Sequence, residues 1–339
     1  MKRIHIAGAG LAGLALGNAL QASGVPTTIH EAGTLPRHRV CGEFICGRGA
    51  TALQQLGLSR ALDGALLHQS IHWYLKEKRI LRSTLPLPAQ GISRYLLDQR
   101  LAERFQALGG TLQLRSRLNS SKKTDGIIYC TGRKASDSNW IGLKFHCMNL
   151  ITHADLELHL GENAYLGMSA IENGRVNVCA LFKKRDELKA NREDWMFTYL
   201  DACGLSTVRQ RIAAAEIDPA SYAGVAGINF SEPPDHASKH LRLGDAYSVI
   251  PPFTGNGMSI ALESAEIAFP KCLAYANNRQ SWDETVNQIQ QACDTRFSRR
   301  LKAAKRLHPW ISESKRQHTL ATLSRLHLLP FRLLYKATH

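Results

Sequence analysis

RIHIAGAGLAG, residues 3–13, is the stretch of sequence that decides the fold. Its first six residues are mostly apolar or small and predict a short buried strand. From Leu11 to Ala22 the residues are again small and apolar, which predicts a buried helix that ends at Ser23-Gly24. Residues 25–31 (VPTTIHE) predict a second strand. A strand, a helix and a strand in this order predict a βαβ unit, and therefore a parallel sheet with a right-handed crossover.

Three glycines lie between this strand and this helix, with the spacing Gly8-x-Gly10-x-x-Gly13. In that context the first permits a tight turn, the second lets the backbone approach a pyrophosphate, and the third lets helix and strand pack closely. The start of the helix would present free N–H groups and a partial positive charge to the phosphates. Glu31 ends the second strand, where a carboxylate can accept hydrogen bonds from an adenosine ribose. The unit predicts dinucleotide binding but does not separate NAD from FAD.

A second informative stretch is residues 243–259 (LGDAYSVIPPFTGNGMS). It predicts a buried strand that ends at Gly-Asp, a loop stiffened by two prolines, and a Gly-x-Gly turn that begins a helix. Asp245 at the strand end can bind a polyol hydroxyl, and the free N–H groups of Gly257 and Met258 can bind a carbonyl oxygen that gains negative charge on reduction. A ribityl chain and a flavin ring supply these two features, whereas NAD does not. The stretch therefore favours FAD.

Four stretches in this order resemble the para-hydroxybenzoate hydroxylase-like flavoprotein superfamily, and within it the geranylgeranyl reductase-like group. They are the glycine motif with Glu31, residues 39–43 (RVCGE), residues 93–101 (SRYLLDQRL) and residues 244–257. The resemblance covers the chain to about residue 275. It implies that Arg39 and Arg94 contact FAD and that Asp245 binds its ribityl chain. It also implies that Cys41 lies near the isoalloxazine ring, where it could tune the flavin, line the pocket or simply be a small buried residue.

The sequence names no catalytic residue. The predicted cofactor-binding residues are Gly8, Gly10, Leu11, Ala12, Gly13, Glu31, Arg39, Cys41, Arg94, Asp245, Gly255, Gly257 and Met258.

The resemblance also implies an α/β fold with a discontinuous organisation. A Rossmann-type FAD-binding domain would comprise residues 1–70, 93–142 and 236–275, and a mainly antiparallel substrate domain would comprise residues 71–92 and 143–235. Residues 276–339 would form a basic helical C-terminal segment. Strands separated by turn signals from residue 143 onward agree with the antiparallel sheet. We further expect helices over residues 50–66 and 187–215, and a kink or break at Pro270.

Departures from the family's motifs bear on the chemistry. Thr131-Gly132 stands where hydroxylases usually carry Asp-Gly, no Trp-x-Trp-x-Ile-Pro motif of halogenases is present, and residues 165–170 (YLGMSA) lack the Trp-x-Phe-Pro motif of prenyl reductases. We expect an NAD(P)H-dependent monooxygenase-like enzyme that acts on a hydrophobic or aromatic small molecule. NAD(P)H would reduce the flavin from outside, since there is no second dinucleotide motif. A prenyl or polyene reductase or dehydrogenase, and a flavin-binding sensor without turnover, are the alternatives.

Positive charge is concentrated near the end of the sequence. Of the net charge of +15, residues 296–339 contribute +10, from eleven Lys/Arg and the single acid Glu313. Phe297, Leu301, Ala304 and Ile311 share one helical face, so the segment is basic and amphipathic. Such a segment can dock as a helical cap, make peripheral contact with an anionic membrane, or take up a lipid-like substrate. Nucleic-acid binding is not expected, because the aromatic residues do not alternate with the basic ones.

Composition sets the remaining bounds. Apolar residues make up 44%, which is typical of a folded globular protein. The eight cysteines are scattered without a Cys-x-x-Cys pair, so we expect free thiols and no metal site. The longest apolar run, residues 6–17, is too short to span a membrane. We expect a cytoplasmic protein, with peripheral membrane contact through the C-terminal segment as a further possibility.

Overall fold

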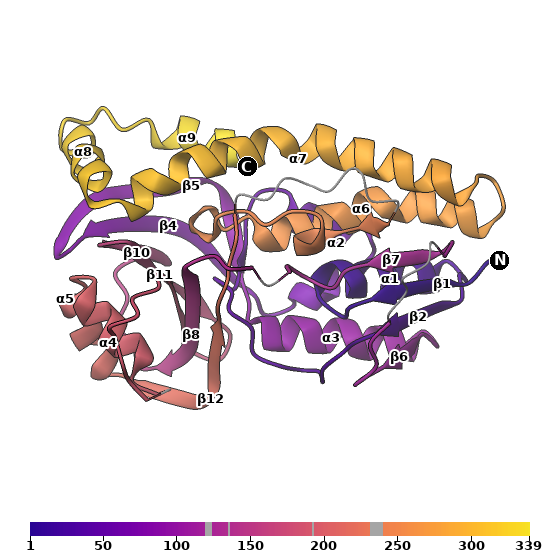
Figure 1. Ribbon diagram of the computed structural model, residues 1–339, viewed down its shortest axis with the longest axis horizontal. Helices are drawn as coiled ribbons and strands as arrows, with labels where there is room; N and C mark the ends of the chain where they lie inside the picture. The colour runs from indigo at the N-terminus through magenta and orange to yellow at the C-terminus, as the bar shows by residue number, and fades with distance from the viewer. Residues whose placement is uncertain (119–123, 135, 192, 231–239) are drawn as a thin grey trace.

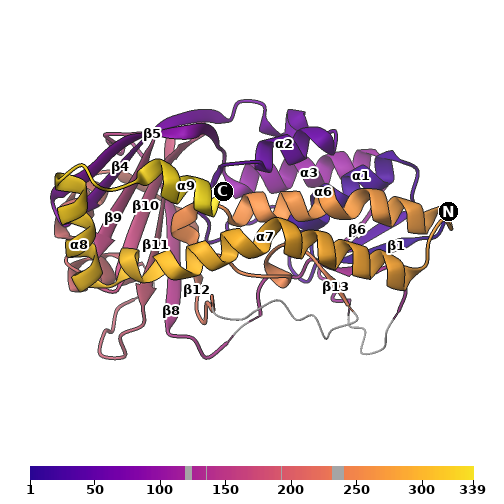
Figure 2. The same cartoon turned by 90° about the horizontal axis from the view of Figure 1, so that it is seen from above.

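The computed structural model describes residues 1–118, 124–134, 136–191, 193–230 and 240–339. Two β-sheets lie side by side, and long helices run over them (Figure 1). From above, the longest helix passes along both sheets (Figure 2). The predicted domain boundary between residues 235 and 236 lies outside the described residues.

Sheet A is parallel and forms around the N-terminal strand, in the order β13-β7-β1-β2-β6. Its strands are β1 Ile4–Ala7, β2 Thr27–His30, β6 Thr111–Gln113, β7 Ile127–Tyr129 and β13 Leu241–Arg242. Ile6 of β1 lies opposite Ile29 of β2 and Ile128 of β7, and all three side chains are fully buried. The predicted βαβ unit is confirmed.

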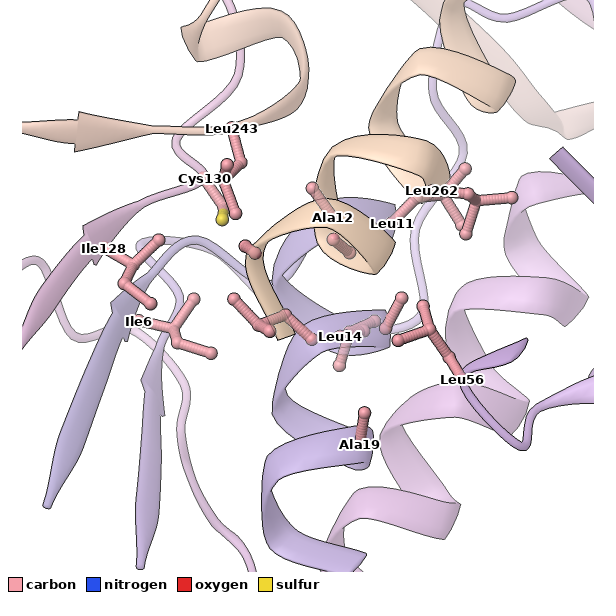
Figure 3. Packing of buried hydrophobic residues seen from close by; sticks show 14 of the residues in the cluster. Ile6, Leu11, Ala12, Leu14, Ala19, Leu56, Ile128, Cys130, Leu243 and Leu262 are labelled. Carbon is pink, nitrogen blue, oxygen red and sulfur yellow. The ribbon is translucent and has the colours of Figure 1, made fainter. Parts of the chain in front are cut away.

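Four α-helices belong to the same part of the molecule as sheet A, and two of them begin at the two glycine turns. They are α1 Leu11–Ala22, α2 Gly49–Gln55, α3 Arg94–Ala107 and α6 Gly257–Ala276. Helix α1 is apolar on nearly all sides because it packs against β1 and β2 and also against α3 and α6. Figure 3 shows Leu14 of α1 in one apolar cluster with Ile6 and Ile128 of the sheet and Leu262 of α6.

Sheet B has eight strands in the order β12-β8-β11-β10-β9-β4-β5-β3, and is antiparallel except where β4 pairs with β9. Its strands are β3 Phe44–Ile45, β4 Leu66–Leu75, β5 Lys78–Gly91, β8 Trp140–Met148, β9 Leu156–Gly161, β10 Ala164–Ile171, β11 Arg175–Lys183 and β12 Glu216–Val225. Side chains alternate between its faces. Leu166 and Val178 join a core with the short helices α4 Trp195–Ala202 and α5 Ser206–Ala213, whereas Tyr165 and Leu181 face the opposite side. The predicted fold class is confirmed.

Three helices complete the chain: α7 Trp282–Ser312, α8 Ser314–Arg325 and α9 Phe331–Thr338. Ser281 and Glu284 form a capping box that begins α7. The predicted apolar face of α7 is buried at Phe297, Leu301 and Ile311, because it packs along α6 and reaches sheet B. Among the described helices, none combines the length and the hydropathy needed to cross a bilayer.

Three local predictions need correction. Helix α6 continues through Pro270, since Ala268 and Cys272 on either side are fixed in the core, so the predicted break is wrong and a kink there stays a prediction. Residues 187–215 contain two short helices separated at Gly204. The helix predicted over residues 50–66 ends at Gln55, before Gly57 and a short 3-10 turn, and strand β4 begins at Leu66. Both glycines have positive φ (71°), a conformation that ends a helix.

Candidate functional site

One cavity of about 1120 Å³ runs from the glycine turn after β1 into the space between sheet B and the C-terminal helices. At one end it is lined by Gly8, Gly10 and Glu31, and at the other by apolar side chains of β4, β9, β10, α7 and α9. The start of α6 lies between these ends, since Gly255, Gly257 and Met258 also line the cavity. The two distant glycine turns therefore open onto a single space.

Close packing requires glycine at Gly8 and at Gly13, whereas Gly10 faces the cavity. A Cβ atom at Gly8 would lie 2.3 Å from the Cys130 carbonyl oxygen, and one at Gly13 would lie 2.1 Å from the Gly8 carbonyl oxygen. At Gly10 the nearest atom to such a Cβ is 4.0 Å away, and at Gly257 nothing lies within 4 Å. Gly10 and Gly257 are therefore not required by contacts within the protein, and the space beside each is open to a ligand.

Helices α1 and α6, which begin at the two glycine turns, both lack a capping side chain. Gly10 and Asn256 occupy the N-cap positions of α1 and α6 without a side-chain hydrogen bond to the first turn, and neither first turn carries an acid. The first N–H groups of each helix, together with its partial positive charge, remain free to bind an acceptor. The two starts are near each other, because a Cβ at Gly244 would lie 3.3 Å from Ala12 Cβ and 3.5 Å from Ala261 Cβ.

Glu31 lies at the carboxyl end of β2, as predicted. Its Oε2 accepts a hydrogen bond from the Ala9 N–H (2.9 Å), its Oε1 accepts one from the Gly33 N–H (2.9 Å), and Arg37 lies 3.3 Å from Oε1. The carboxylate thus fixes the turn after β1 against the turn after β2. It also lines the end of the cavity at the first glycine turn.

Arg39 and Arg94 meet on one buried carboxylate, Asp98 of α3. Arg94 is four residues before Asp98 on the helix and donates to both its oxygens (3.0 and 2.9 Å), and Arg39 Nε donates to Oδ2 (3.2 Å). Burial disfavours the charge on Arg94, but Asp98 outweighs this and raises its pKa. Both guanidinium groups line the cavity, and among the described residues nothing accepts a hydrogen bond from one buried amine of Arg39.

Asp245 follows β13 and is deep in the molecule, yet its side chain is accessible from the cavity. Burial raises the pKa of Asp245, and the charges of Arg94, Arg133 and Arg39 partly oppose that rise. Arg133 is a cavity residue that the sequence analysis missed. The signal was present, because Thr131-Gly132-Arg133 directly follows the buried strand β7 at the carboxyl edge of the parallel sheet.

The segment from Arg39 to Glu43 is fixed to sheet B by side chains of the sheet. Ser169 Oγ donates to the Gly42 carbonyl (2.6 Å), and Asn177 Nδ2 donates to the Cys41 carbonyl (3.0 Å). Cys41 lines the cavity, and burial raises the pKa of its thiol, so it is a neutral group there. These contacts hold the segment between the two sheets.

Glu43 anchors the same segment through a buried charged cluster that the sequence analysis did not foresee. Its Oε1 lies 3.1 Å from Lys144 Nζ and its Oε2 lies 2.6 Å from His146 Nε2, and all three side chains are buried. Burial alone would raise the pKa of Glu43, but His146 and Lys144 hold it below its usual value. His38, 3.2 Å from Lys144 Nζ, lines the cavity, and burial beside Lys144 lowers its pKa to about 4.

The far part of the cavity is an apolar chamber. Sheet B contributes one wall and the C-terminal helices contribute the other. Its lining includes Ile71, Trp73, Leu85, Leu158, Tyr165, Leu181, Ile228, Phe230, Phe253, Trp310, Ile311, Leu320, Leu323, Leu329, Phe331, Leu334 and Tyr335. Tyr165 is held in place because its hydroxyl accepts a hydrogen bond from the Phe253 N–H (3.2 Å). The chamber suits a ligand with extensive apolar surface.

The end of α9 reaches the start of α6. Asn256 Nδ2 donates to the Thr338 carbonyl (2.5 Å), and Cys46 Sγ lies 3.0 Å from His339 Nε2 and 3.1 Å from the Gly255 carbonyl oxygen. The His339 ring stacks on Tyr335, with the ring centroids 3.7 Å apart. Burial lowers the pKa of His339 to about 4 and raises that of Cys46 to about 12, so both are neutral near pH 7. These residues join the chamber wall to the second glycine turn, and no local motif marks them in the sequence.

Twelve of the thirteen predicted cofactor-binding residues line this one cavity. They are Gly8, Gly10, Leu11, Ala12, Glu31, Arg39, Cys41, Arg94, Asp245, Gly255, Gly257 and Met258. Gly13 does not line it, since it packs against the turn at Gly8. Their direct contact with a cofactor stays a prediction.

The architecture places the chain in a structural class: a Rossmann-type parallel sheet, a mainly antiparallel sheet beside it and C-terminal helices, with one cavity between them. Solved structures of this class match nearly the whole chain. HpxO of Klebsiella pneumoniae, complexed with FAD and uric acid, superposes with a TM-score of 0.77 at 15% identity, over 99% of this chain and 95% of its own.

Two further structures have the same fold. The flavin-dependent brominase Bmp2 gives a TM-score of 0.74 at 14% identity, covering 98% of this chain and 94% of its own. PqsL of P. aeruginosa, in complex with 2-aminobenzoylacetate, gives 0.72 at 13% identity, covering 94% and 99%. No model of a known protein family matches the sequence, and no curated protein does. At these identities the similarities establish the fold.

Proposed function

We propose that this protein is an FAD-dependent oxidoreductase, a monooxygenase-like enzyme that uses NAD(P)H to act on a hydrophobic or aromatic small molecule. The observation that carries the proposal is the single cavity, which joins the uncapped start of α1, the uncapped start of α6 and the apolar chamber. A dinucleotide with an adenosine at one end, a diphosphate in its middle and a redox ring at the other end fits this order of features.

The residues present fit FAD. The space beside Gly10 and Gly257, where a Cβ would meet no protein atom closer than 4.0 Å, allows a ligand to approach the backbone at both helix starts. Arg39, Arg94 and Arg133 supply positive charge around the middle of the cavity, which favours a diphosphate. FAD, when bound, would supply the two-electron redox chemistry.

The chain's own groups would bind and orient the cofactor and its substrate. The N–H groups at the start of α1 would donate hydrogen bonds to phosphate oxygens. Glu31 would accept hydrogen bonds from ribose hydroxyls, and Asp245 would accept them from hydroxyls of the ribityl chain. The N–H groups of Gly257 and Met258 would donate to a ring carbonyl. The apolar chamber would exclude water and place the substrate beside the ring. NAD(P)H would act transiently, since the chain has one dinucleotide motif.

The known ligands of the structural neighbours support the substrate class. HpxO was crystallised with uric acid, a flat heterocycle, and PqsL with 2-aminobenzoylacetate, which contains a benzene ring. The chamber of this chain has aromatic walls of its own at Trp73, Tyr165 and Phe230. Its many leucines and isoleucines also favour a second candidate, a reductase or dehydrogenase of prenyl or polyene double bonds, as in the geranylgeranyl reductase-like group.

Spectroscopy and product analysis test the proposal. We expect the purified protein to bind FAD, with flavin absorption bands, and to oxidise NADH or NADPH faster when an aromatic acid is added. An oxygenated product would support the monooxygenase, whereas a saturated product formed without oxygen would support the reductase. A protein that shifts the flavin spectrum on ligand binding but never turns over would be a sensor, and failure to bind FAD would refute the whole proposal.

Asp245→Asn supplies a matched variant for the cofactor site. Its side chain keeps its size but loses the charge that faces Arg94 and Arg133. We expect weaker FAD binding with an unchanged thermal midpoint of the apoprotein, because Asp245 is exposed to the cavity rather than packed in a core. Asp201→Asn, on the exposed surface of α4, is the control.

A further inference from the structure

An exposed surface at the end of the chain is built from leucines and basic residues. We call it the α8–α9 surface and define it as Arg325, Leu326, His327, Leu328, Arg332, Leu333 and Lys336. Leu326, Leu328 and Leu333 expose 61%, 63% and 68% of their area, more than most large apolar side chains of the chain. Helix α8 and its connection to α9 lie at the outer edge of the molecule in both views (Figures 1 and 2).

Two of these leucines are next in the sequence to leucines that point inward. Leu329 and Leu334 line the chamber, as does Leu323 of α8, whereas Leu328 and Leu333, the immediate neighbours of the first two, are exposed. The connection between α8 and α9 therefore has apolar side chains on two sides, one facing the chamber and the other facing the outside of the molecule. Only the thickness of this segment separates the outer leucines from the chamber.

The charges along residues 314–339, which include this surface, have one sign. From residue 314 to residue 339 the chain has five Lys/Arg and no Asp or Glu. Arg325, Arg332 and Lys336 are exposed beside the three leucines. Protruding aliphatic side chains that are surrounded by cations complement an interface with anionic headgroups and an apolar interior.

We propose that the α8–α9 surface docks on an anionic phospholipid bilayer, with Leu326, Leu328 and Leu333 in the headgroup region and the basic side chains on the phosphates. A stable protein–protein contact involves about 20–30 residues from each partner, far more than this surface offers. A bilayer has no such requirement, because a few apolar side chains and several cations suffice for reversible binding. Docking in this way would bring the chamber wall against the lipid, from which an apolar ligand could enter.

Vesicle sedimentation tests the proposal without relying on flavin or turnover. The full-length protein is spun with vesicles of phosphatidylglycerol and phosphatidylcholine in equal parts, and with vesicles of phosphatidylcholine alone. We expect binding to the mixed vesicles, and a fall of about tenfold or more in the partition coefficient for L328E/L333E. L108E/L114E is the matched control, since both of these leucines are exposed but lie beside sheet A.

A second pair separates local charge from net charge. R325E/K336E and R299E/K302E change the net charge equally, but only the first pair belongs to the α8–α9 surface, whereas the second lies on exposed positions of α7. We expect only the first pair to release the protein. Equal loss from both pairs, no binding to the mixed vesicles, or binding that L328E/L333E leaves unchanged would overturn the proposal. So would a dimer in solution that L328E/L333E dissociates, because a second copy would then cover this surface.

Discussion

Gly10 and Gly13 belong to one motif, but alanine is expected to change a different property at each position. At Gly13 it should lower the stability of the protein, and at Gly10 it should weaken FAD binding. At Gly13 the new Cβ would lie 2.1 Å from the Gly8 carbonyl oxygen and 3.2 Å from Cys130 Cβ. Overpacking of this kind costs about 1–3 kcal/mol, and the better helix propensity of alanine returns at most about 1 kcal/mol. We therefore expect Gly13→Ala to lower the free energy of unfolding of the apoprotein by about 1–2 kcal/mol.

At Gly10 the backbone has φ −85° and ψ −176°, which alanine adopts without strain, and the nearest atom to the new Cβ is 4.0 Å away. The stability of Gly10→Ala should be unchanged or raised by up to about 1 kcal/mol, because alanine restricts the unfolded chain. The added methyl group would, however, occupy the space that we assign to the diphosphate. Loss of one hydrogen bond to a charged group costs about 1.5–3 kcal/mol, which corresponds to a rise of roughly 10- to 100-fold in the Kd for FAD.

Two measurements on each variant check this pair: urea unfolding of the apoprotein, and titration with FAD followed by quenching of flavin fluorescence. Gly257→Ala should behave like Gly10→Ala, since nothing lies within 4 Å of its added Cβ. Unaltered FAD affinity in Gly10→Ala would show that the diphosphate is not held at this turn. A Gly13→Ala protein as stable as the wild type would show that the contact with Gly8 can relax.

Two further predictions concern stability. Arg300→Met should lower the free energy of unfolding by about 3 kcal/mol in a urea titration, because it leaves the buried Glu263 without its bidentate partner (2.9 Å), and exposed Arg299→Met should change it little. Burial lowers the pKa of His308 from 6.5 to about 4, so the unfolded chain binds the proton first and stability should fall as the pH drops from about 6.5 to 4. The fall amounts to about 3 kcal/mol, and His308→Leu should flatten the profile between these pH values by that amount; an unchanged slope would exclude His308 as its source.

Local spacing made the end of the cavity at the glycine turns predictable. Gly8, Gly10 and Glu31 are placed by one βαβ unit, and Asp245 and Gly257 by one strand, loop and helix start, so their positions follow from neighbouring residues. The convergence of these two stretches was implied by the resemblance to the flavoprotein superfamily and by neither stretch alone.

The remainder depends on contacts between distant residues that no local pattern encodes. Glu43 pairs with Lys144 and His146, about a hundred residues away in the sequence. The register of β8 in sheet B sets this pairing, and an alternation of apolar and polar residues does not determine the register. The leucines of α8 and α9 indicated amphipathic helices but not which of them line the chamber. For the same reason the sequence did not reveal that Thr338 bonds to Asn256 at the start of α6.

One wall of the apolar chamber is encoded in a different part of the chain from the rest of the cavity. The glycine turns, their charged neighbours and the sheet B wall lie before residue 260, whereas the opposite wall comes from residues 307–339. Changes in residues 307–339 can therefore alter which molecules the chamber admits, while the residues before 260 stay the same. These changes are limited at one place: Thr338 and His339 contact Asn256 and Cys46, so any altered C-terminal segment must still present residues that match the second turn.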